Sequence, residues 1–276
     1  MEDWRTLNLA NWEERTAVHF GPGGYDLSSH RSGRGAFDAI VEAELGSVAG
    51  LRVLHLQCHI GDDSIALAQR GAAAVVGVDF SPAAILAARG LAGEVGATQA
   101  RLIESDVHAA PEVLVLEGGT YDLVFTTWGT ITWLPDLDRW ARVVAYFLRP
   151  GGALYFADLH PVAAVFDGIA QPSDPQRRPG WCMPYFARDP QVFDEPMDYA
   201  DSSVRLANSR TVNRLHPIGN ILAALAAAGL RLEWLHEHPR LPWRFLPGLV
   251  RDAEGLWTWP DKRWLPLAMS LRAVRD

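Results

Sequence analysis

The sequence predicts an α/β protein built around a mostly parallel sheet. Between about Leu51 and Asp158, short apolar runs rich in β-branched residues alternate with segments in which apolar residues recur every three or four positions. The first pattern is typical of buried strands, and the second of helices that pack on a sheet. Their alternation indicates repeated βα units with helices on both faces. The chain has 276 residues, 49% of them hydrophobic, which is enough for one sizeable core with an elaborated cap.

Five strands and three helices are expected in this region. Ser81 and Pro82 supply an N-cap and a first helical residue for the second helix. The sequence LRPGG, from Leu148 to Gly152, predicts that the third helix ends in a tight turn before the next strand. The strands are expected at Arg52–Leu56, Ala74–Asp79, Ala100–Glu104, Tyr121–Thr126 and Ala153–Asp158, and the helices at Asp63–Arg70, Pro82–Leu91 and Leu137–Phe147.

The composition and the hydrophobic periodicity of the sequence change after His160. Residues 161–214 are rich in proline, aspartate, arginine and aromatics without a sustained period, which indicates an inserted cap. A helix is then expected over His216–Gly229, followed by strands at Leu230–His236 and Leu265–Val274. Four tryptophans between these two strands either wall a binding site or pack a terminal hairpin onto the sheet: Trp243, Trp257, Trp259 and Trp264. The predicted organisation is therefore a lid segment over 1–50, an α/β core over 51–160, a cap over 161–214, and a helix with a β-hairpin over 215–276.

Charge and composition exclude several classes of partner. The net charge is −8 and the 25 basic residues are scattered, so a nucleic-acid partner is not expected. The N-terminus lacks the pattern of a signal peptide, and the longest apolar helix candidate, Ile221–Leu230, is about half of a membrane-spanning length. We therefore expect a soluble, cytoplasmic protein without a membrane partner. Cys58 and Cys182 are too few for a disulfide framework and are expected to be free thiols.

The sequence VLHLQCHIGDDSIALA, from Val53 to Ala68, predicts a strand, a sharp loop and a helix. A dinucleotide-binding turn has the pattern G-x-G-x-x-G, but here Gln57 and His59 occupy the first two glycine positions and only Gly61 remains. Asp62 and Asp63 at the helix start would repel a phosphate. A cationic ligand fits better, and S-adenosylmethionine carries a sulfonium and an ammonium group but no phosphate. The alternative is that both aspartates only cap the helix.

Two more carboxylates follow the second and third strands. Asp79 lies about twenty residues beyond the first loop, where an acidic side chain can accept hydrogen bonds from both hydroxyls of an adenosine ribose. Phe80 beside it is a candidate for contact with the adenine face. Asp106, in the sequence IESDVH, can accept from an adenine amino group, although alone it would be interpreted as a solvated loop aspartate. An NAD-dependent oxidoreductase is disfavoured because the glycines are missing.

These sites, in this order, resemble the class I S-adenosylmethionine-dependent methyltransferases, and more narrowly a bacterial subgroup whose first motif reads LHLQCHxG. The likeness also includes NWEERTAVH near the start, YDLVFTTWGTITWLPDL and FLRPGGALYFADLHP in the middle, and ALAAAGLRLEWLHEHP and LPLAMSLRA near the end. The resemblance implies a Rossmann-like, seven-stranded sheet with an antiparallel last strand, and S-adenosyl-L-methionine as cofactor, with S-adenosyl-L-homocysteine as product.

The resemblance also implies roles for particular residues. It assigns Gln57 to Gly61, including His59, to the methionine part of the cofactor, and backbone around Thr126 and Thr127 to the same end. It assigns Asp79 to the ribose, and Asp106 with Val107 to the adenine. The family usually has an acidic residue where His55 stands, and Asp63 is the candidate that replaces it.

Cys58, His55 and His59 are candidate ligands for a metal ion. Alternation along a strand places His55 and Gln57 on one face and Cys58 on the other, so the three ligands would converge only in a distorted turn. Buried, hydrogen-bonded histidines are the commoner arrangement. We therefore predict no metal site.

Methyl transfer from a sulfonium is an in-line displacement, so positioning and exclusion of water supply most of the rate. If the acceptor is a hydroxyl or an activated carbon, a base is also needed, and the candidates are Asp158, His160 and His216. The alternative is that His160 only terminates the fifth strand and that His216 is a structural residue of the following helix. Tyr25, in GPGGYDL, lies on a segment that can close over the cofactor.

Aromatic residues favour a small, partly apolar methyl acceptor in an enclosed pocket; the candidates are Trp128, Trp133, Trp181 and Tyr185. The predicted function is therefore methylation of a small molecule. The alternative is a protein that binds S-adenosylmethionine and either catalyses a rearrangement without methyl transfer or serves as a binding module.

Overall fold

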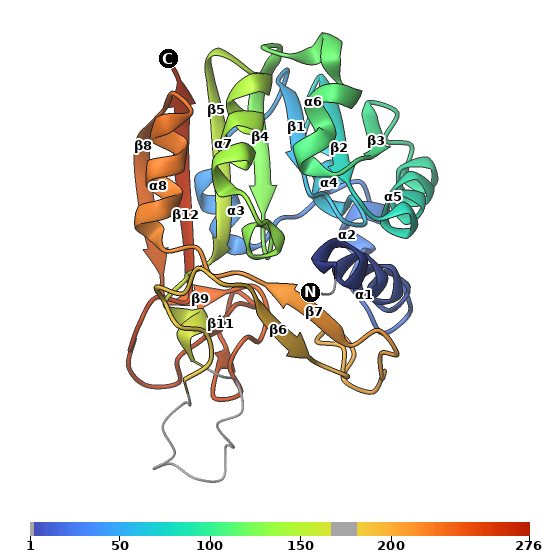
Figure 1. The fold of residues 1–276 in the computed structure, drawn as a ribbon. Coiled ribbons are helices and arrows are strands. Elements are labelled where there is room, and N and C mark those ends of the chain that lie inside the picture. Colours follow the sequence, from blue (N-terminus) through green and yellow to red (C-terminus); the bar gives the residue numbers. More distant parts are fainter. Residues whose placement is uncertain (1–2, 167–180) are drawn as a thin grey trace.

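The computed structural model describes residues 3–166 and 181–276 (Figure 1). Within them, the central sheet has seven strands in the order β3-β2-β1-β4-β5-β12-β8. Strands β1 to β5 pair in parallel, whereas β12 is antiparallel to both β5 and β8. The predicted fold class is confirmed, including the antiparallel last strand. The strands are β1 (Arg52–Leu56), β2 (Ala74–Asp79), β3 (Ala100–Glu104), β4 (Tyr121–Thr127), β5 (Leu148–Leu159), β8 (Leu230–His238) and β12 (Ala268–Arg275).

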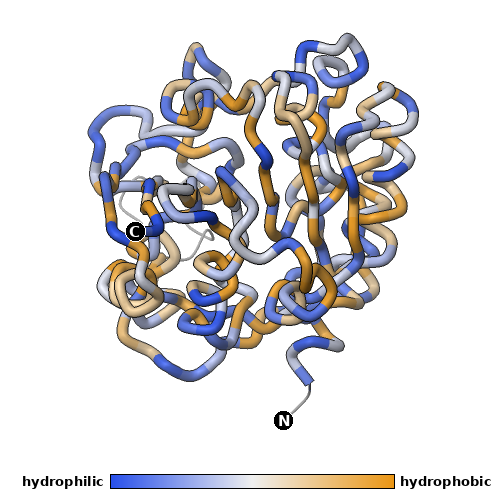
Figure 2. Tube along the Cα trace, turned by 90° about the horizontal axis from the view of Figure 1, so that it is seen from above, coloured by the Kyte–Doolittle hydropathy of each residue, from blue (hydrophilic) through white to orange (hydrophobic). Residues whose placement is uncertain are grey.

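Helices cover both faces of the sheet, because its strands are apolar on both sides. On one face, Trp140 and Phe147 of α7 and Ile221 of α8 enter the core. On the other face, Ile65 of α4 and Ile85 of α5 do the same. In Figure 2 the strands in the middle of the molecule are mostly hydrophobic, and hydrophilic stretches gather at the outer turns. These helices are α3 (Ala39–Glu44), α4 (Asp62–Gln69), α5 (Pro82–Val95), α7 (Leu137–Phe147) and α8 (Ile218–Ala227), with short turns at α6 (Ala110–Val113), η1 (Val107–Ala109), η2 (Val115–Glu117), η3 (Ile131–Trp133) and η4 (Ala163–Val165).

One local prediction was wrong. The sequence LRPGG does not form a tight turn, because β5 begins directly after α7 and continues through these residues. Tyr121 of β4 pairs with Leu148, but Leu123 pairs with Ala153, so the extra residues bulge out of the ladder. Gly151 takes φ 74° there, a conformation that glycine adopts without a steric penalty.

The N-terminal helix and part of the insertion lie along the carboxyl edge of the sheet (Figure 1). Helix α1 (Trp4–His19) packs on the hairpin of β6 (Gln191–Asp194) and β7 (Arg210–Asn213), and α2 (Ser28–Arg31) follows α1. The side chain of Asn8 pairs with the backbone of Val212 through both its oxygen and its nitrogen, at 2.7 and 2.9 Å. Residues 167–180 of the predicted cap lie outside the described residues.

The segment between β8 and β12 forms a small sheet of β9 (Arg240–Leu241), β10 (Val250–Arg251) and β11 (Trp257–Thr258). Trp243, Trp257 and Trp259 pack there with Leu241 and Leu267, whereas Trp264 is largely exposed. Three of the four tryptophans therefore build a local core. Among the described residues, none of the helices has the length and apolar character needed to cross a bilayer.

Candidate cofactor and acceptor site

The first βα loop keeps the backbone of a glycine-rich turn although its glycines are replaced. Gln57 and His59 take φ values of 58° and 48°, and Gly61 takes 72°. Non-glycine residues rarely adopt this left-handed region, so both side chains are retained at a conformational cost. Gly61 is required by packing, because a Cβ there would lie 2.8 Å from Cβ of Ala88 on α5. The loop therefore has left-handed residues at three alternate positions, and two of them carry side chains.

Half-buried carboxylates surround the start of α4. Asp63 accepts a hydrogen bond of 2.9 Å from Oγ1 of Thr127 at the end of β4. Burial and the neighbouring charge of Asp62 hold the pKa of Asp63 well above its usual range, and burial also raises the pKa of Asp62. Among the ion pairs of the described residues, none joins either aspartate to a lysine or arginine. A desolvated, uncompensated acidic pair at this place favours a positively charged ligand.

Two buried oxygens nearby also have no hydrogen-bond partner within the described part of the chain. Nε2 of Gln57 donates to the carbonyl of Thr130 at 2.9 Å, which leaves Oε1 of Gln57 without a donor. The second buried oxygen without a partner is Oγ1 of Thr126, in β4. Buried polar atoms are usually paired, so an orphaned acceptor beside an acidic pair indicates a missing donor.

Asp79 ends β2 with its carboxylate turned back to the first loop. Oδ2 accepts from the backbone N–H of His59 at 2.9 Å, and Oδ1 accepts from that of Ser81 at 3.0 Å. Burial raises the pKa of Asp79 to about 6. Each oxygen keeps a second lone pair, so the carboxylate can still accept from a ligand. Phe80 next to it is half-buried.

Asp106 lies at the end of β3, beneath the first turn of α1. Its carboxylate accepts from the backbone N–H of His108 at 2.7 Å and pairs with Nη2 of Arg5 at 3.0 Å. Val107 follows with its side chain buried in the core. Asp106, one of the two residues assigned to adenine by resemblance, thus pairs with a basic residue of α1 that sequence reasoning did not single out.

Asp158 anchors the loop after β4. Its carboxylate accepts from the backbone N–H groups of Gly129, Thr130 and Ile131 at 2.7, 2.9 and 3.2 Å, and from Oγ1 of Thr130 at 3.0 Å. It also accepts from its neighbour Leu159 at 2.7 Å. Because several donors of the loop share this carboxylate, the geometry supports a structural role in which Asp158 holds the loop in place. Its role as a base stays a prediction.

The other predicted catalytic side chains lie apart from one another. Nδ1 of His160 accepts from the N–H of Val162 at 3.1 Å, and its Nε2 lies 2.9 Å from Oε1 of Glu237, so both ring nitrogens are engaged. Nε2 of His216 donates to the carbonyl of Leu134 at 3.1 Å, beside the β4 loop. Burial lowers the pKa of both histidines.

Tyr25 belongs to a different group above the first loop. Its ring stacks on that of His19 with centroids 4.7 Å apart, and its hydroxyl lies 2.6 Å from that of Tyr199. Burial raises the pKa of the Tyr25 phenol well above its usual range, so the phenol stays protonated near neutral pH.

The four aromatics predicted to line the acceptor pocket do not all come together. Trp128 and Trp133 flank the β4 loop: Nε1 of Trp128 donates to Asp38 at 2.8 Å, and Trp133 meets Trp12 edge to face at 5.4 Å. Trp181 is 82% exposed and stacks on Phe166. The hydroxyl of Tyr185 accepts from the backbone of Ile218.

The candidate metal ligands point to different partners. Nδ1 of His55 bonds Oγ of Ser64 at 2.8 Å, His59 turns to His19, and Cys58 is buried without a disulfide. Across residues 3–166 and 181–276, no three His, Cys, Asp or Glu side chains are grouped to hold a metal ion.

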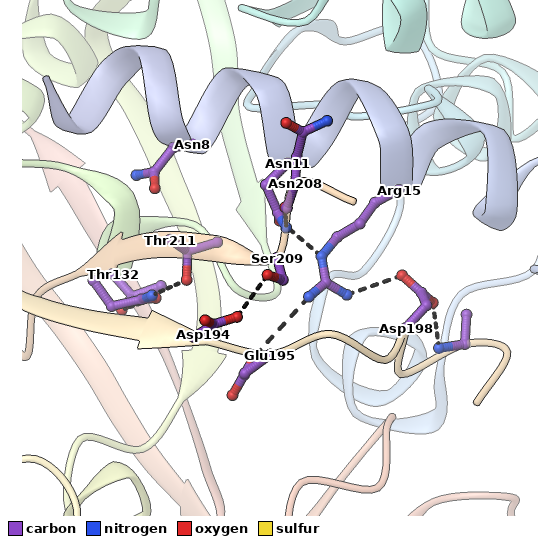
Figure 3. A network of polar contacts seen from close by, with 12 residues as sticks. Asn8, Asn11, Arg15, Thr132, Asp194, Glu195, Asp198, Asn208, Ser209 and Thr211 are labelled. Atoms are coloured by element: carbon purple, nitrogen blue, oxygen red, sulfur yellow. Dashed lines mark hydrogen bonds and ion pairs between the residues drawn. The ribbon is translucent and has the colours of Figure 1, made fainter. Parts of the chain in front are cut away.

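Sequence reasoning missed a polar stripe on α1. Asn8, Asn11, Arg15 and His19 recur at helical spacing and are all buried. Figure 3 shows Asn11 and Arg15 reaching from α1 to the insertion, where Arg15 pairs with the buried Asp198 at 2.9 Å. The signal was present in the sequence NWEERTAVH, because polar residues at a period that normally carries apolar ones indicate a buried polar contact.

Part of the chain matches a known domain family. Residues 53–152 match the profile of a family described as "Methyltransferase domain". No curated protein shows significant sequence similarity to the chain.

Several solved structures share the fold. An S-adenosylmethionine-dependent methyltransferase from Mesorhizobium loti is 23% identical over 86% of this chain and 96% of its own, with a TM-score of 0.59. Magnesium protoporphyrin IX methyltransferase from Synechocystis PCC 6803, crystallised with bound S-adenosylhomocysteine, is 18% identical over 99% and 100% of the two chains, with a TM-score of 0.56. A (4+2)-cyclase is 14% identical over 99% and 94%, with a TM-score of 0.55. These similarities establish the fold.

Proposed function

We propose that this chain is an S-adenosylmethionine-dependent methyltransferase that acts on a small, partly apolar molecule. The observation that carries the proposal is the first βα loop, which has the backbone of a nucleotide-binding turn but is surrounded by uncompensated carboxylates. Such a loop suits a nucleoside that carries positive charge and no phosphate. The methyltransferase domain match over residues 53–152 supports the same assignment.

The groups around the loop fit this cofactor chemically. Gln57 Oε1, Asp62 and Asp63 are acceptors, which suits an ammonium group, and Asp79 is an acceptor placed for ribose hydroxyls. Gln57, His59, Gly61 and Asp63 would hold the methionine part with backbone of Thr126 and Thr127. Asp79 and Phe80 would hold the ribose side, and Asp106 with Val107 the adenine. When bound, the cofactor supplies an electrophilic methyl group.

The contribution of the protein is to hold the acceptor and to exclude water. The Asp158 contacts fix the loop from Gly129 to Ile131 before any ligand binds, so this wall of the site is preorganised. Helix α1 and the β6–β7 hairpin lie along the carboxyl edge, and Trp12 packs against Trp133 there. We retain His216 as the candidate base for acceptors that lose a proton, because it lies beside the β4 loop.

The first experiment measures binding by calorimetry with S-adenosylmethionine, S-adenosylhomocysteine and NAD. We expect binding of the first two and none of NAD. Asp79→Ala should weaken S-adenosylmethionine binding at least about tenfold, since it loses a charged hydrogen-bond acceptor. Glu104→Gln is the matched control, because Glu104 pairs with Asp79 in the sheet register and is exposed. Binding of NAD alone would overturn the proposal.

A second experiment separates methylation from other uses of the cofactor. The protein is incubated with a metabolite extract and S-adenosylmethionine that carries a deuterated methyl group. We expect S-adenosylhomocysteine and a labelled small molecule, and less of both with Asp79→Ala at a cofactor concentration below the dissociation constant of the variant. Tight binding without formation of S-adenosylhomocysteine would instead favour a rearrangement catalyst or a binding module.

A further inference from the structure

A carboxylate of α1 lies beside the carboxyl end of β2. Glu13 is half-buried, and its Oε1 accepts from the hydroxyl of Ser81 and from the backbone N–H of Ala83, the latter at 3.2 Å. Both donors belong to the start of α5, 68 and 70 positions further along the chain. Helix α1 therefore brings an acidic side chain to the segment that follows Asp79, and sequence reasoning assigned no role to that side chain.

Only one residue separates Glu13 from the carboxylate assigned to the ribose. The backbone N–H of Ser81 donates to Oδ1 of Asp79 at 3.0 Å, and the hydroxyl of the same serine donates to Glu13. Burial is the main cause of the raised pKa of Asp79, and the charge of Glu13 adds to it. The two carboxylates therefore lie close enough to repel each other.

The donors in the first turn of α5 are already used. Pro82 has no N–H, and the N–H of Ala83 bonds to Glu13. The N–H of Ala84 bonds to Oγ of Ser81 at 3.0 Å. The start of a helix attracts anions through its free N–H groups and its dipole. Here a carboxylate of the protein takes that place, so a second anion would meet a negative charge and none of these donors.

The two carboxylates have no cationic partner within residues 3–166 and 181–276, because no ion pair there joins Glu13 or Asp79 to a lysine or an arginine. The sequence VDFSPAA, from Val78 to Ala84, also has no basic residue. In dinucleotide-binding folds, an arginine near the ribose carboxylate accommodates a phosphate on the 2′-hydroxyl. The arrangement here is the reverse, since the side chain added beside the ribose carboxylate is a second acid.

We propose that Glu13 is a specificity-determining residue of the cofactor site, which excludes adenosyl compounds that carry a phosphate on the ribose. This inference rests on the proposed function, because that function assigns Asp79 to the ribose hydroxyls. A free hydroxyl donates to a carboxylate, whereas a phosphate in the same place is a negatively charged acceptor and is repelled by both carboxylates. The site thereby selects S-adenosylmethionine against compounds that share its adenosine but are phosphorylated at the 2′- or 3′-position.

Glu13→Gln removes the charge and keeps the shape of the side chain. The glutamine oxygen can still accept from Ser81 and Ala83, so the contact between α1 and α5 is retained. The matched control is Glu14→Gln, which removes one negative charge from the next residue of α1. Glu14 is also half-buried, but it accepts from the backbone N–H of Ala207 in the insertion, at 2.8 Å, and not from α5.

Calorimetry with three probes measures this selectivity: S-adenosylhomocysteine and its two analogues that carry a phosphate on the 2′- or the 3′-oxygen. We expect wild type to bind both analogues at least about 30-fold more weakly than S-adenosylhomocysteine. Glu13→Gln should reduce this ratio about 3- to 10-fold for at least one analogue, whereas Glu14→Gln should leave both ratios unchanged. The effect of Glu13→Gln should shrink between about 0.05 and 0.5 M salt, because salt screens the repulsion.

Glu13→Ala is the second variant, and it should lose more selectivity than Glu13→Gln because it also frees the N–H of Ala83 for a phosphate. The inference is overturned if wild type binds the analogues as tightly as S-adenosylhomocysteine, or if neither Glu13 variant changes the ratio. An equal effect of Glu14→Gln would also overturn it, because the place of the charge would then not matter. If wild type binds neither S-adenosylmethionine nor S-adenosylhomocysteine, the proposed function fails, whereas normal binding with an unchanged ratio refutes only the role of Glu13.

Discussion

The backbone N–H of His59 donates to Oδ2 of Asp79 across 2.9 Å, which joins the first βα loop to the end of β2. The residue that the sequence marks as an unusual replacement for glycine is thus bound, through its backbone, to the carboxylate assigned to the ribose. These two features of the candidate site are therefore directly joined, and a change in the ionisation of Asp79 acts on the backbone of His59.

The pH dependence of binding and of stability should have opposite signs at Asp79. Burial raises its pKa from 3.8 to about 6, so the folded protein binds more protons than the unfolded chain between these values. The contribution of Asp79 to stability is therefore present at low pH and lost as pH rises through about 6. Binding of S-adenosylmethionine should strengthen over the same range, because the ionised carboxylate is the better acceptor and attracts the cation.

Thermal unfolding and calorimetry at about pH 5, 6 and 7 check this prediction. Asp62 and Asp63 shift in the same direction, so the informative quantity is the difference between wild type and Asp79→Asn. We expect that difference to change with pH for both measurements. A difference in affinity that stays constant across the range would contradict the assignment.

Gln57→Gly should weaken cofactor binding although it relaxes the backbone. Glycine removes the strain of φ 58°, but it also removes the Nε2 bond to Thr130 and the orphaned Oε1 acceptor. We expect the dissociation constant of S-adenosylmethionine to rise about three- to tenfold while the melting temperature stays equal or increases. Tighter binding by calorimetry would show that the side chain only obstructs the site.

Asp158→Ala should loosen the loop after β4. Three backbone N–H groups of this loop lose their shared acceptor, so we expect a loss of about 3 kcal/mol in the free energy of unfolding. Urea denaturation measures it, and faster hydrogen exchange confined to Gly129–Ile131 locates it. Glu233→Gln, which alters an exposed contact of Arg272, is the control for a carboxylate whose loss is nearly neutral. Unchanged exchange in the loop would argue against the anchoring role.

Gly61→Ala and Gly90→Ala should have opposite effects on stability. At Gly61 the new Cβ meets Ala88 at 2.8 Å and the backbone has φ 72°, so we expect a loss of about 1–3 kcal/mol. Gly90 lies inside α5 with open space around it, and alanine there should stabilise by about 0.5–1 kcal/mol. Denaturant midpoints of the two variants should therefore move in opposite directions; a shift of both in one direction would refute the packing argument.

Most strands and helices of the core could be predicted, because their apolar periodicity is a local property of the chain. The expected strands at Arg52–Leu56, Ala74–Asp79 and Ala100–Glu104 have the predicted bounds, and so does the helix at Leu137–Phe147. LRPGG was misjudged because proline and paired glycine indicate a turn locally, whereas pairing with β4 draws the segment into β5.

The unusual residues of the first loop were also evident from the sequence. Gln57 and His59 stand where glycines are usual, and Asp62 and Asp63 follow them at the start of the helix. The roles of Asp158 and His160 were harder to predict from the sequence. A carboxylate at the end of a strand has the same sequence signature whether it meets a substrate or three backbone N–H groups, and only the position of the β4 loop distinguishes them.

The sequence by itself determined the α/β architecture, the strand and helix order of the core, and a first βα loop rich in carboxylates where nucleotide-binding turns have glycines. Only the tertiary structure decided what covers that loop. His19 and Asp198 are separated by 179 residues, and no periodicity in either segment indicates the other. Side-chain polarity and spacing are properties of the local sequence, whereas a hydrogen bond between distant residues depends on which groups the fold brings within about 3 Å of each other.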